Sequence, residues 1–376
     1  MIIGVCKETE KNEKRVAMTP EGVEKLIEMG FTLHVEKDAG AESSYPDEVY
    51  KKAGAELIDS RDSILKNCDL LLTVQAPDEE SVNKLKNGAV LIGFLWPLQN
   101  KPYVDLLIKK NVTGMAMDTI PRISRAQSMD ALSSMSNIAG YKSALLGANQ
   151  LDRYLPMMMT AAGTIPPAKV LVLGAGVAGL QAIATAKRLG AVVEAFDIRP
   201  AVKEQVESLG AKFVEVPMDE EQETETKSGY AKEQGEREKE KQKEVTHQHV
   251  RKSDIVITTA LIPGRPAPKL ITKQMVEDMS PGSVVVDLAA EQGGNCELTK
   301  PGETIYHNGV AIMGPLNLPS TLANHASKLY SKNMLSLLDL LTEEGKPNFN
   351  FDDEIIINAT VTHNGELISP FVKENS

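Results

Sequence analysis

The sequence has few cysteines, no long apolar run and no excess of positive charge. Its cysteines, Cys6, Cys68 and Cys296, lie far apart with no metal-ligand spacing, which indicates free thiols in a reducing compartment. No stretch approaches the roughly 18 consecutive apolar residues of a membrane span, so none is expected. The formal net charge of −11 argues against nucleic acid or an anionic membrane surface as the main partner.

The length of the chain and its first residues indicate what kind of protein to expect. A chain of 376 residues is long enough for two domains of ordinary size, each with its own hydrophobic core. The opening Met-Ile-Ile-Gly-Val-Cys-Lys lacks the layout of a signal peptide and is typical of a first β-strand. We therefore expect a globular, cytoplasmic protein.

Short apolar runs alternate with helical patterns, which predicts an α/β protein with parallel sheets. The expected strands of the N-terminal region are residues 2–6, 31–35, 70–74, 90–95 and 112–117, with a helix from Thr19 to Met29. Those of the following region are residues 170–173, 191–196, 212–216, 255–259, 283–288 and 310–313. A helix over 327–341 and strands over 355–358 and 360–362 follow, and Met157 to Met159 are expected to be packing residues.

This order predicts two Rossmann-like, doubly wound parallel-sheet domains separated by a cleft. Residues 1–135 with 326–376 form the first, discontinuous domain, because the C-terminal elements are too few to fold alone. Residues 136–325 form the second domain.

Residues 170–199 are the most informative stretch of the chain. An apolar run meets Gly174-Ala-Gly-Val-Ala-Gly179, a helical pattern follows, and a second apolar run ends on Asp197. Gly174 permits a tight turn, Gly176 lets the backbone approach a pyrophosphate, and Gly179 lets helix and strand pack closely. The helix N-terminus offers N–H groups to the phosphates. Asp197 can accept hydrogen bonds from both ribose hydroxyls and would repel a 2′-phosphate, which favours NAD(H) over NADP(H).

The segment from Met218 to Glu244 breaks the pattern, because it is rich in charge and has Tyr230 as its single large apolar residue. Residues 236–244 suit an exposed helix with i,i+4 ion pairs, and residues 218–235 are expected to form a mobile charged loop. The loop is either a solvated insertion or a lid whose Tyr230 closes over a bound nucleotide.

Several motifs resemble those of the NAD(H)-binding component of proton-translocating NAD(P) transhydrogenases. They are Pro121-Arg-Ile-Ser-Arg-Ala-Gln-Ser-Met-Asp130, Ser136-Asn-Ile-Ala-Gly-Tyr141, Pro156-Met-Met-Met-Thr-Ala-Ala-Gly-Thr164, Ser228-Gly-Tyr-Ala-Lys232, Ile257-Thr-Thr-Ala-Leu-Ile-Pro-Gly264 and Gly293-Gly-Asn-Cys296. The resemblance extends over essentially the whole chain.

This resemblance implies an oxidoreductase component that binds NAD(H) and exchanges hydride directly with NADP(H) on a partner domain. A separate membrane component would conduct the protons, and the chain alone would be almost inactive. The resemblance also implies a homodimer attached peripherally to the inner membrane through its partner subunits.

The resemblance assigns the positioning of the nicotinamide ring to Arg122, Gln127 and Asp130, with Ser133 alongside. Arg122 would lie near the carboxamide, Gln127 would reach toward the partner nucleotide, and Asp130 would hold the nicotinamide end and pair with Arg122. From the residues alone, Arg122 and Asp130 could equally form a surface salt bridge. The full set of expected cofactor-binding residues is Arg122, Gln127, Asp130, Ser133, Gly174, Gly176, Val177, Ala178, Gly179, Asp197, Ile198, Arg199, Tyr230, Ala260 and Leu261.

Two alternatives stay open. Alanine dehydrogenases share the architecture, and Arg15 matches their substrate arginine, but their lysine and histidine positions fall on Gln75 and Trp96, which cannot titrate. Arg15 is then expected to pair with Glu8 or Glu13. The other alternative is an NAD(H)-binding redox sensor. No metal site is expected.

Overall fold

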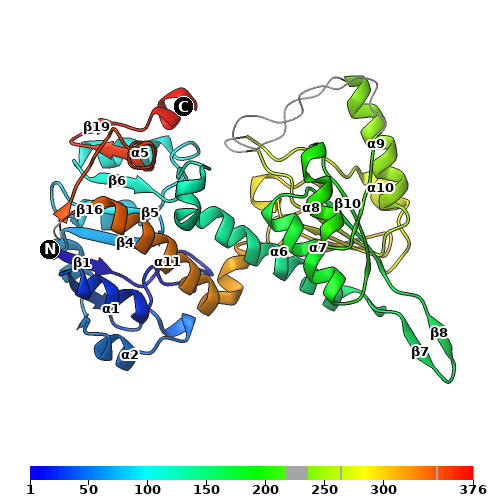
Figure 1. Ribbon diagram of the computed structural model, residues 1–376, viewed down its shortest axis with the longest axis horizontal. Coiled ribbons are helices and arrows are strands. Elements are labelled where there is room, and N and C mark those ends of the chain that lie inside the picture. Colours follow the sequence, from blue (N-terminus) through cyan, green and yellow to red (C-terminus); the bar gives the residue numbers. More distant parts are fainter. Residues whose placement is uncertain (217–235, 263–264, 344–345, 376) are drawn as a thin grey trace. The chain divides into compact units, whose positions relative to one another are not determined.

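The computed structural model describes residues 1–216, 236–262, 265–343 and 346–375, which belong to two compact units (Figure 1). The first unit joins Met1–Met135 to Pro319–Ser376, and the second is Ser136–Leu318. The chain thus returns to the first unit at Pro319, where the sequence pattern suggested residue 326.

The described residues of the first unit form an eight-stranded sheet in the order β19-β18-β6-β5-β4-β1-β2-β3. Strands β1 to β6 run parallel, and β18 and β19 add an antiparallel edge. Every residue of β5 is buried, as expected for a strand with both faces covered. The strands are β1 (Ile2–Val5), β2 (Thr32–Glu36), β3 (Glu56–Ile58), β4 (Leu70–Gln75), β5 (Val90–Phe94), β6 (Thr113–Ala116), β18 (Thr360–His363) and β19 (Glu366–Leu367).

Helices surround this sheet. Thr19 occupies the predicted N-cap position of α1, but its hydroxyl donates to Ser331 Oγ of α11 at 3.2 Å instead of capping the helix. The helix α11 is buried along most of one side, and the Tyr330 hydroxyl donates to the Thr73 carbonyl at 2.9 Å. The helices are α1 (Pro20–Glu28), α2 (Asp47–Lys52), α3 (Arg61–Asn67), α4 (Glu79–Lys84), α5 (Lys101–Lys109), α11 (Ala323–Leu341), α12 (Glu354–Ala359) and α13 (Pro370–Asn375), with the 3₁₀ turns η1 (Ala41–Ser43), η2 (Ser124–Met129) and η5 (Leu318–Leu322).

The prediction of a strand over residues 355–358 was wrong, because this segment is the helix α12. Asp353 begins the helix by accepting a hydrogen bond from the backbone N–H of Ile355 at 2.8 Å. The apolar run of Ile355 and Ile356 is buried by the helix, so hydrophobicity alone could not separate the two structures.

The described part of the second unit forms a seven-stranded sheet in the order β11-β10-β9-β12-β13-β15-β14. All of these strands are parallel except β14 at the edge. The elements are β9 (Lys169–Leu173), α7 (Val177–Arg188), β10 (Val192–Phe196), α8 (Lys203–Ser208), β11 (Lys212–Phe213), α9 (Glu236–Val250), β12 (Ile255–Thr258), α10 (Lys273–Glu277), β13 (Val284–Asp287), β14 (Thr304–His307) and β15 (Val310–Met313). The predicted α/β class with parallel sheets is confirmed in both units.

A two-stranded hairpin projects from the second unit (Figure 1). It pairs β7 (Met158–Thr160) with β8 (Gly163–Ile165), and all residues of both strands are exposed. Met157 is 57% exposed and Met159 is 75% exposed, so the expectation that these methionines are packing residues was wrong.

The long helix α6 (Ala131–Gln150) begins in the first unit and continues into the second. The expected exposed helix after residue 236 is α9, whereas the predicted charged loop and Tyr230 lie outside the described residues. Within the described part of the chain, no helix has the length and apolarity required to cross a membrane.

Candidate functional site

The glycine-rich turn between β9 and α7 has the geometry that the sequence predicts for a phosphate-binding turn. Gly174 has φ +100°, a conformation that L side chains rarely adopt. A Cβ on Gly179 would lie 1.9 Å from the Gly174 carbonyl oxygen, so only glycine fits there. A Cβ on Gly176 would meet nothing within 4 Å of the described protein atoms, so its backbone is open to a ligand.

The N-terminus of α7 follows this turn directly. Gly176 is the N-cap, and among the described residues no side chain hydrogen-bonds to the helix end there. Val177 is 40% exposed, and the partly buried Ala178 lies beside it. A helix end with unpaired N–H groups and a positive dipole end suits an anion, so the turn fits a dinucleotide pyrophosphate.

The helix α6 packs closely against the first turns of α7. A Cβ on Gly140 would lie 2.0 Å from the Ala178 carbonyl oxygen, which shows how closely the two backbones approach. Asn137 Nδ2 also donates to Gln181 Oε1 of α7 at 3.1 Å. The sequence motif contained Gly140, but only the structure reveals its role in holding α7.

Asp197 lies at the carboxyl end of β10, beside the glycine-rich turn. Its Oδ2 accepts from the backbone N–H of Ala175 at 2.7 Å and from Arg199 Nη2 at 2.8 Å. Its Oδ1 accepts from the backbone N–H of Arg199 and from Arg199 Nε, both at 2.9 Å. The ion pair is largely covered, since the side chains of Asp197 and Arg199 are 6% and 16% exposed, and Ile198 between them is partly buried.

Asn295 shapes the loop that carries Ala260 and Leu261. Its Oδ1 accepts from the Ala260 N–H at 3.0 Å, and its Nδ2 donates to the carbonyl oxygens of Ala260 and Pro268, each at 2.8 Å. Asn295 is fully buried, whereas Leu261 is 41% exposed. Sequence reasoning placed Asn295 in a motif without a role; a buried amide that mimics a backbone partner has no sequence signal of its own.

The predicted loop of residues 121–133 lies in the first unit. Ala126 and Met129 of η2 are buried and anchor the loop, whereas Arg122 and Gln127 are exposed. Arg125 adds a bidentate ion pair with Asp353, at 2.7 and 2.8 Å. The loop therefore presents its polar side chains from a fixed backbone.

Asp130 and Ser133 form one hydrogen-bonded unit at the start of α6. Asp130 Oδ1 accepts from the Ser133 N–H at 2.8 Å, and Oδ2 accepts from the Ser133 hydroxyl at 2.6 Å. This is the geometry of a helix N-cap, so Asp130 has a structural role besides the one predicted for it.

Arg15 is paired inside the first unit. Its Nε donates to Glu13 Oε1 at 2.7 Å and its Nη2 to Glu13 Oε2 at 2.5 Å, so the expected ion pair is confirmed with Glu13. Gln75 Nε2 donates to Glu13 Oε2 at 3.1 Å, and the Trp96 indole N–H points to Gln75 Oε1 at 3.5 Å. The carboxylate of Glu13 thus takes the bidentate position that an arginine offers to a carboxylate ligand.

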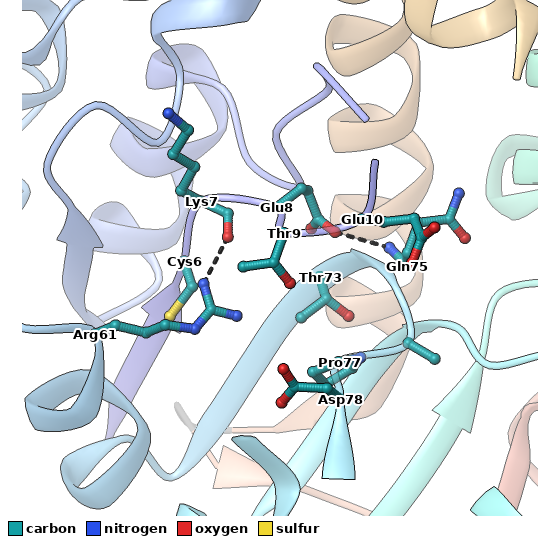
Figure 2. Close-up of a pocket in the computed structure, with 11 residues that line it drawn as sticks. Cys6, Lys7, Glu8, Thr9, Glu10, Arg61, Thr73, Gln75, Pro77 and Asp78 are labelled. Atoms are coloured by element: carbon teal, nitrogen blue, oxygen red, sulfur yellow. Dashed lines mark hydrogen bonds between the residues drawn. The ribbon is translucent and has the colours of Figure 1, made fainter. Parts of the chain in front are cut away.

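A cavity of about 110 Å³ lies at the carboxyl ends of β1 and β4 (Figure 2). The strand order reverses there, which is where open α/β sheets bind ligands. Arg61 Nη1 donates to the Lys7 carbonyl at 2.6 Å, and Glu8 accepts from the N–H groups of Val74 and Gln75 at 2.6 and 3.2 Å. Arg61 and Glu8 are thus held by protein atoms, and the described lining residues include none of the predicted nucleotide-binding residues.

The predicted site residues therefore fall into two groups. Arg122, Gln127, Asp130 and Ser133 belong to the first unit; Gly174, Gly176, Val177, Ala178, Gly179, Asp197, Ile198, Arg199, Ala260 and Leu261 belong to the second. Among the described residues, no three His, Cys, Asp or Glu side chains cluster as metal ligands. His247 and His249, two residues apart, do not share a partner, because His247 contacts Asp278 and His249 contacts Glu194.

Similarity to known proteins agrees with this geometry. The sequence matches the models of the alanine dehydrogenase/PNT N-terminal domain over residues 4–139 and C-terminal domain over residues 143–370. An NAD(P) transhydrogenase subunit alpha chain of Rhodospirillum rubrum is 48% identical over 377 residues, which cover 98% of each chain. The crystal structure of a transhydrogenase from Sinorhizobium meliloti, 45% identical, matches 98% of this chain and 100% of that chain with a TM-score of 0.88.

An L-alanine dehydrogenase structure, 26% identical, matches 100% of this chain and 99% of that chain with a TM-score of 0.82. These matches confirm the two-domain α/β fold and the predicted family resemblance. The chain therefore belongs to the alanine dehydrogenase/PNT family.

Proposed function

We propose that this chain is the NAD(H)-binding component of a proton-translocating NAD(P) transhydrogenase. It binds NAD(H) at the glycine-rich turn of the second unit and exchanges hydride with NADP(H) held by a partner domain. A separate membrane component couples the exchange to proton translocation. In this proposal the chain is a homodimer that is attached to the membrane through its partners and is nearly inactive without them.

The observation that carries the proposal is the end-to-end similarity to the Rhodospirillum rubrum subunit alpha chain, at 48% identity over 98% of both chains. The geometry supports it, because Gly174, Gly176 and Gly179 each meet the requirement of a dinucleotide turn. Asp197 at the end of β10 supports NAD(H) rather than NADP(H) as the nucleotide bound here.

The reaction needs little acid–base chemistry from the protein. The hydride on C4 of the NADH nicotinamide passes to C4 of the NADP⁺ nicotinamide, so NADH is oxidised to NAD⁺ and NADP⁺ is reduced to NADPH without release of a proton. The protein has to orient the ring and exclude water at a ring-to-ring approach of about 3–3.5 Å. We assign this positioning to Arg122, Gln127, Asp130 and Ser133.

The test mixes this chain with a soluble NADP(H)-binding transhydrogenase domain and follows reduction of an NAD⁺ analogue by NADPH. A parallel reaction holds the chain alone with NADH, pyruvate and ammonium. We expect rapid hydride transfer in the first reaction and no oxidation of NADH in the second. Turnover in the second reaction alone would instead identify an alanine dehydrogenase, an alternative favoured by the structural match to that enzyme.

The contacts of Arg15 disfavour that alternative. A substrate carboxylate would have to displace Glu13 from its two hydrogen bonds with Arg15. Gln75 and Trp96 offer no proton donor of suitable pKa for the reduction of an imine. NADH binding without turnover in either reaction would leave two explanations, a mismatched partner domain or a redox sensor.

Asp130 gives a sharper test of the positioning role. Asn is as good an N-cap as Asp, so Asp130→Asn keeps the start of α6 while removing the charge. We expect this variant to slow hydride transfer at least tenfold while changing NADH affinity by less than about threefold. Arg122→Ala should behave in the same way, and equal losses of transfer and binding in both variants would remove the positioning role.

A further inference from the structure

In this structure four hydrogen bonds to Asp197 occupy the acceptor positions that a bound ribose would use. A carboxylate offers about four acceptor positions, two on each oxygen. In this structure four N–H donors occupy them, one from Ala175 and three from Arg199. A ribose that donates two hydroxyl hydrogen bonds to Asp197 therefore has to displace two of these donors.

The four donors differ in how easily they move. The N–H groups of Ala175 and Arg199 belong to the backbone, one in the glycine-rich turn and the other directly after β10. The Nε and Nη2 donors belong to the long side chain of Arg199, which can rotate. If this side chain leaves, each carboxylate oxygen keeps one backbone donor and regains one acceptor position, which matches the two hydroxyls of a ribose.

Although Arg199 was expected among the cofactor-binding residues, we propose that its side chain is a specificity determinant that opposes NAD(H) binding. It holds the two acceptor positions on Asp197 that the adenosine ribose requires. This inference rests on the proposed function, since it concerns the same nucleotide site. NAD(H) binds only as the guanidinium swings off Asp197, and the broken ion pair lowers the affinity for NAD(H).

The same contact weakens discrimination against NADP(H). A 2′-phosphate is excluded from such a site mainly by the negative charge of the acid, which a paired guanidinium neutralises. The side chain of Arg199 therefore lowers the preference of the site for NAD(H) over NADP(H) in two ways: it competes with the ribose hydroxyls, and it compensates the charge that repels the phosphate.

The test is the binding of NADH and NADPH to Arg199→Met, measured by nucleotide fluorescence at fixed ionic strength with the full chain. We expect NADH to bind about fivefold more tightly than to the wild type, as for the loss of a competing ion pair. NADPH should bind no more tightly, so the ratio of the two affinities rises. Arg188→Met, in the exposed last turn of α7, serves as the matched control and should leave both affinities unchanged.

A double-mutant cycle separates this role from a structural one. In the Asp197→Asn background the Arg199→Met change should alter NADH affinity by less than about twofold, because the contact that it breaks is no longer an ion pair. An equal gain in both backgrounds would overturn the proposal, and so would weaker or unchanged NADH binding by the single variant. If Arg199→Met lacks a cooperative melting transition, Arg199→Lys replaces it, since Lys lacks the planar fork, and a gain of about twofold is then expected.

Failure of the proposed function gives a different result. A wild-type chain that binds neither NADH nor NADPH would refute nucleotide binding itself and the inference with it. A wild type that binds NADH, with Arg199→Met binding it no better, would refute only the role of Arg199.

Discussion

Two partly buried carboxyl groups of the first unit accept hydrogen bonds from backbone N–H groups. Burial raises the pKa of Glu8 to about 7, although hydrogen bonds from Val74 and Gln75 oppose the shift. Burial likewise raises the pKa of Asp118 to about 6, against hydrogen bonds from the N–H groups of Leu95 and Trp96. Both groups bind protons more tightly in the folded protein than in the unfolded chain.

The sign of the pH dependence follows for Glu8. Its contribution to the unfolding free energy is fully present below pH 4.5, its ordinary pKa, and is lost as the pH rises through about 7. Gln resembles the protonated acid at every pH. We therefore predict that, between pH 5 and about 8, the unfolding free energy of the wild type falls by about 2 kcal/mol more than that of Glu8→Gln. Urea unfolding across this range measures the difference.

The matched control is Glu10→Gln, which changes an exposed carboxyl group two residues along the same loop. It should show the wild-type slope of unfolding free energy against pH. A Glu8→Gln slope that is equally steep would mean that Glu8 remains charged across this range in the folded protein.

At the scale of single residues, the sequence identified the charged side chains that could form ion pairs, but not which of them do. Arg15 had two acidic candidates: Glu13, two residues before it, and Glu8, seven residues before it. The structure pairs it with Glu13 and gives Glu8 two backbone N–H donors at the end of β4. That outcome depends on where β1 and β4 run side by side, which the separation of residues in the sequence does not encode.

At the scale of elements, the glycines of the glycine-rich turn and of α7 differ in what surrounds their Cβ positions. Gly179 is limited by the protein, because a Cβ there would overlap the Gly174 carbonyl. Gly176 has open space around its Cβ position among the described atoms, and its φ of −75° suits any residue. The protein itself therefore does not require glycine at position 176.

This contrast yields a prediction. Gly176→Ala should keep the unfolding free energy within about 1 kcal/mol of the wild type, yet bind NADH at least tenfold more weakly, because its methyl group occupies the approach of the pyrophosphate. Gly179→Ala should lose about 3 kcal/mol or more of stability, because a backbone atom has to shift. Urea unfolding and NADH titration of both variants measure the two effects.

Normal NADH affinity in Gly176→Ala would place the nucleotide away from this turn. Unaltered stability in Gly179→Ala would mean that α7 can move away from the turn without loss of packing.

Most parallel strands and long helices could be predicted because each carries a local signal, such as the run before Gly174 or the Thr19-Pro20 helix start. The errors came where a local pattern is ambiguous. The apolar run at Ile355 is compatible with both a helix and a strand, and Asp353 decides for the helix. The hydroxyl of Thr19 bonds to Ser331 of α11, a contact 312 residues away in the sequence that no local rule contains.

At the scale of the whole molecule, the first unit depends on both ends of the chain. Strand β18 pairs with β6, and α11 contributes fully buried side chains such as Tyr330, Met334 and Leu337. Residues 136–318, by contrast, contain every strand of the seven-stranded sheet. The two units therefore differ in what they need in order to fold.

We predict that a chain ending at Leu318 folds its second unit but not its first. The apolar side chains that α11 covers would be exposed, and β6 would lose its neighbour. Trp96 is the single tryptophan and lies in the first unit, so its fluorescence reports on that unit alone. Limited proteolysis should degrade residues 1–135 and leave a fragment of the second unit.

A chain ending at Lys373 is the control, since it removes only the last residues of α13 and keeps the buried Val372. It should give the wild-type fluorescence and the wild-type proteolytic pattern. Resistance of residues 1–135 in the shorter chain would show that the first unit folds without its C-terminal elements.

The exposed hairpin carries methionine side chains that oxidants in solution can reach. The thioethers of Met157 and Met159 lie open to solvent, whereas those of Met18 and Met334 are fully buried. Peroxide and similar oxidants convert exposed methionine to the polar sulfoxide, a change that reductases can reverse. Among the methionines of the described residues, oxidation should therefore begin on the hairpin, and it should make that surface more polar before it reaches either core.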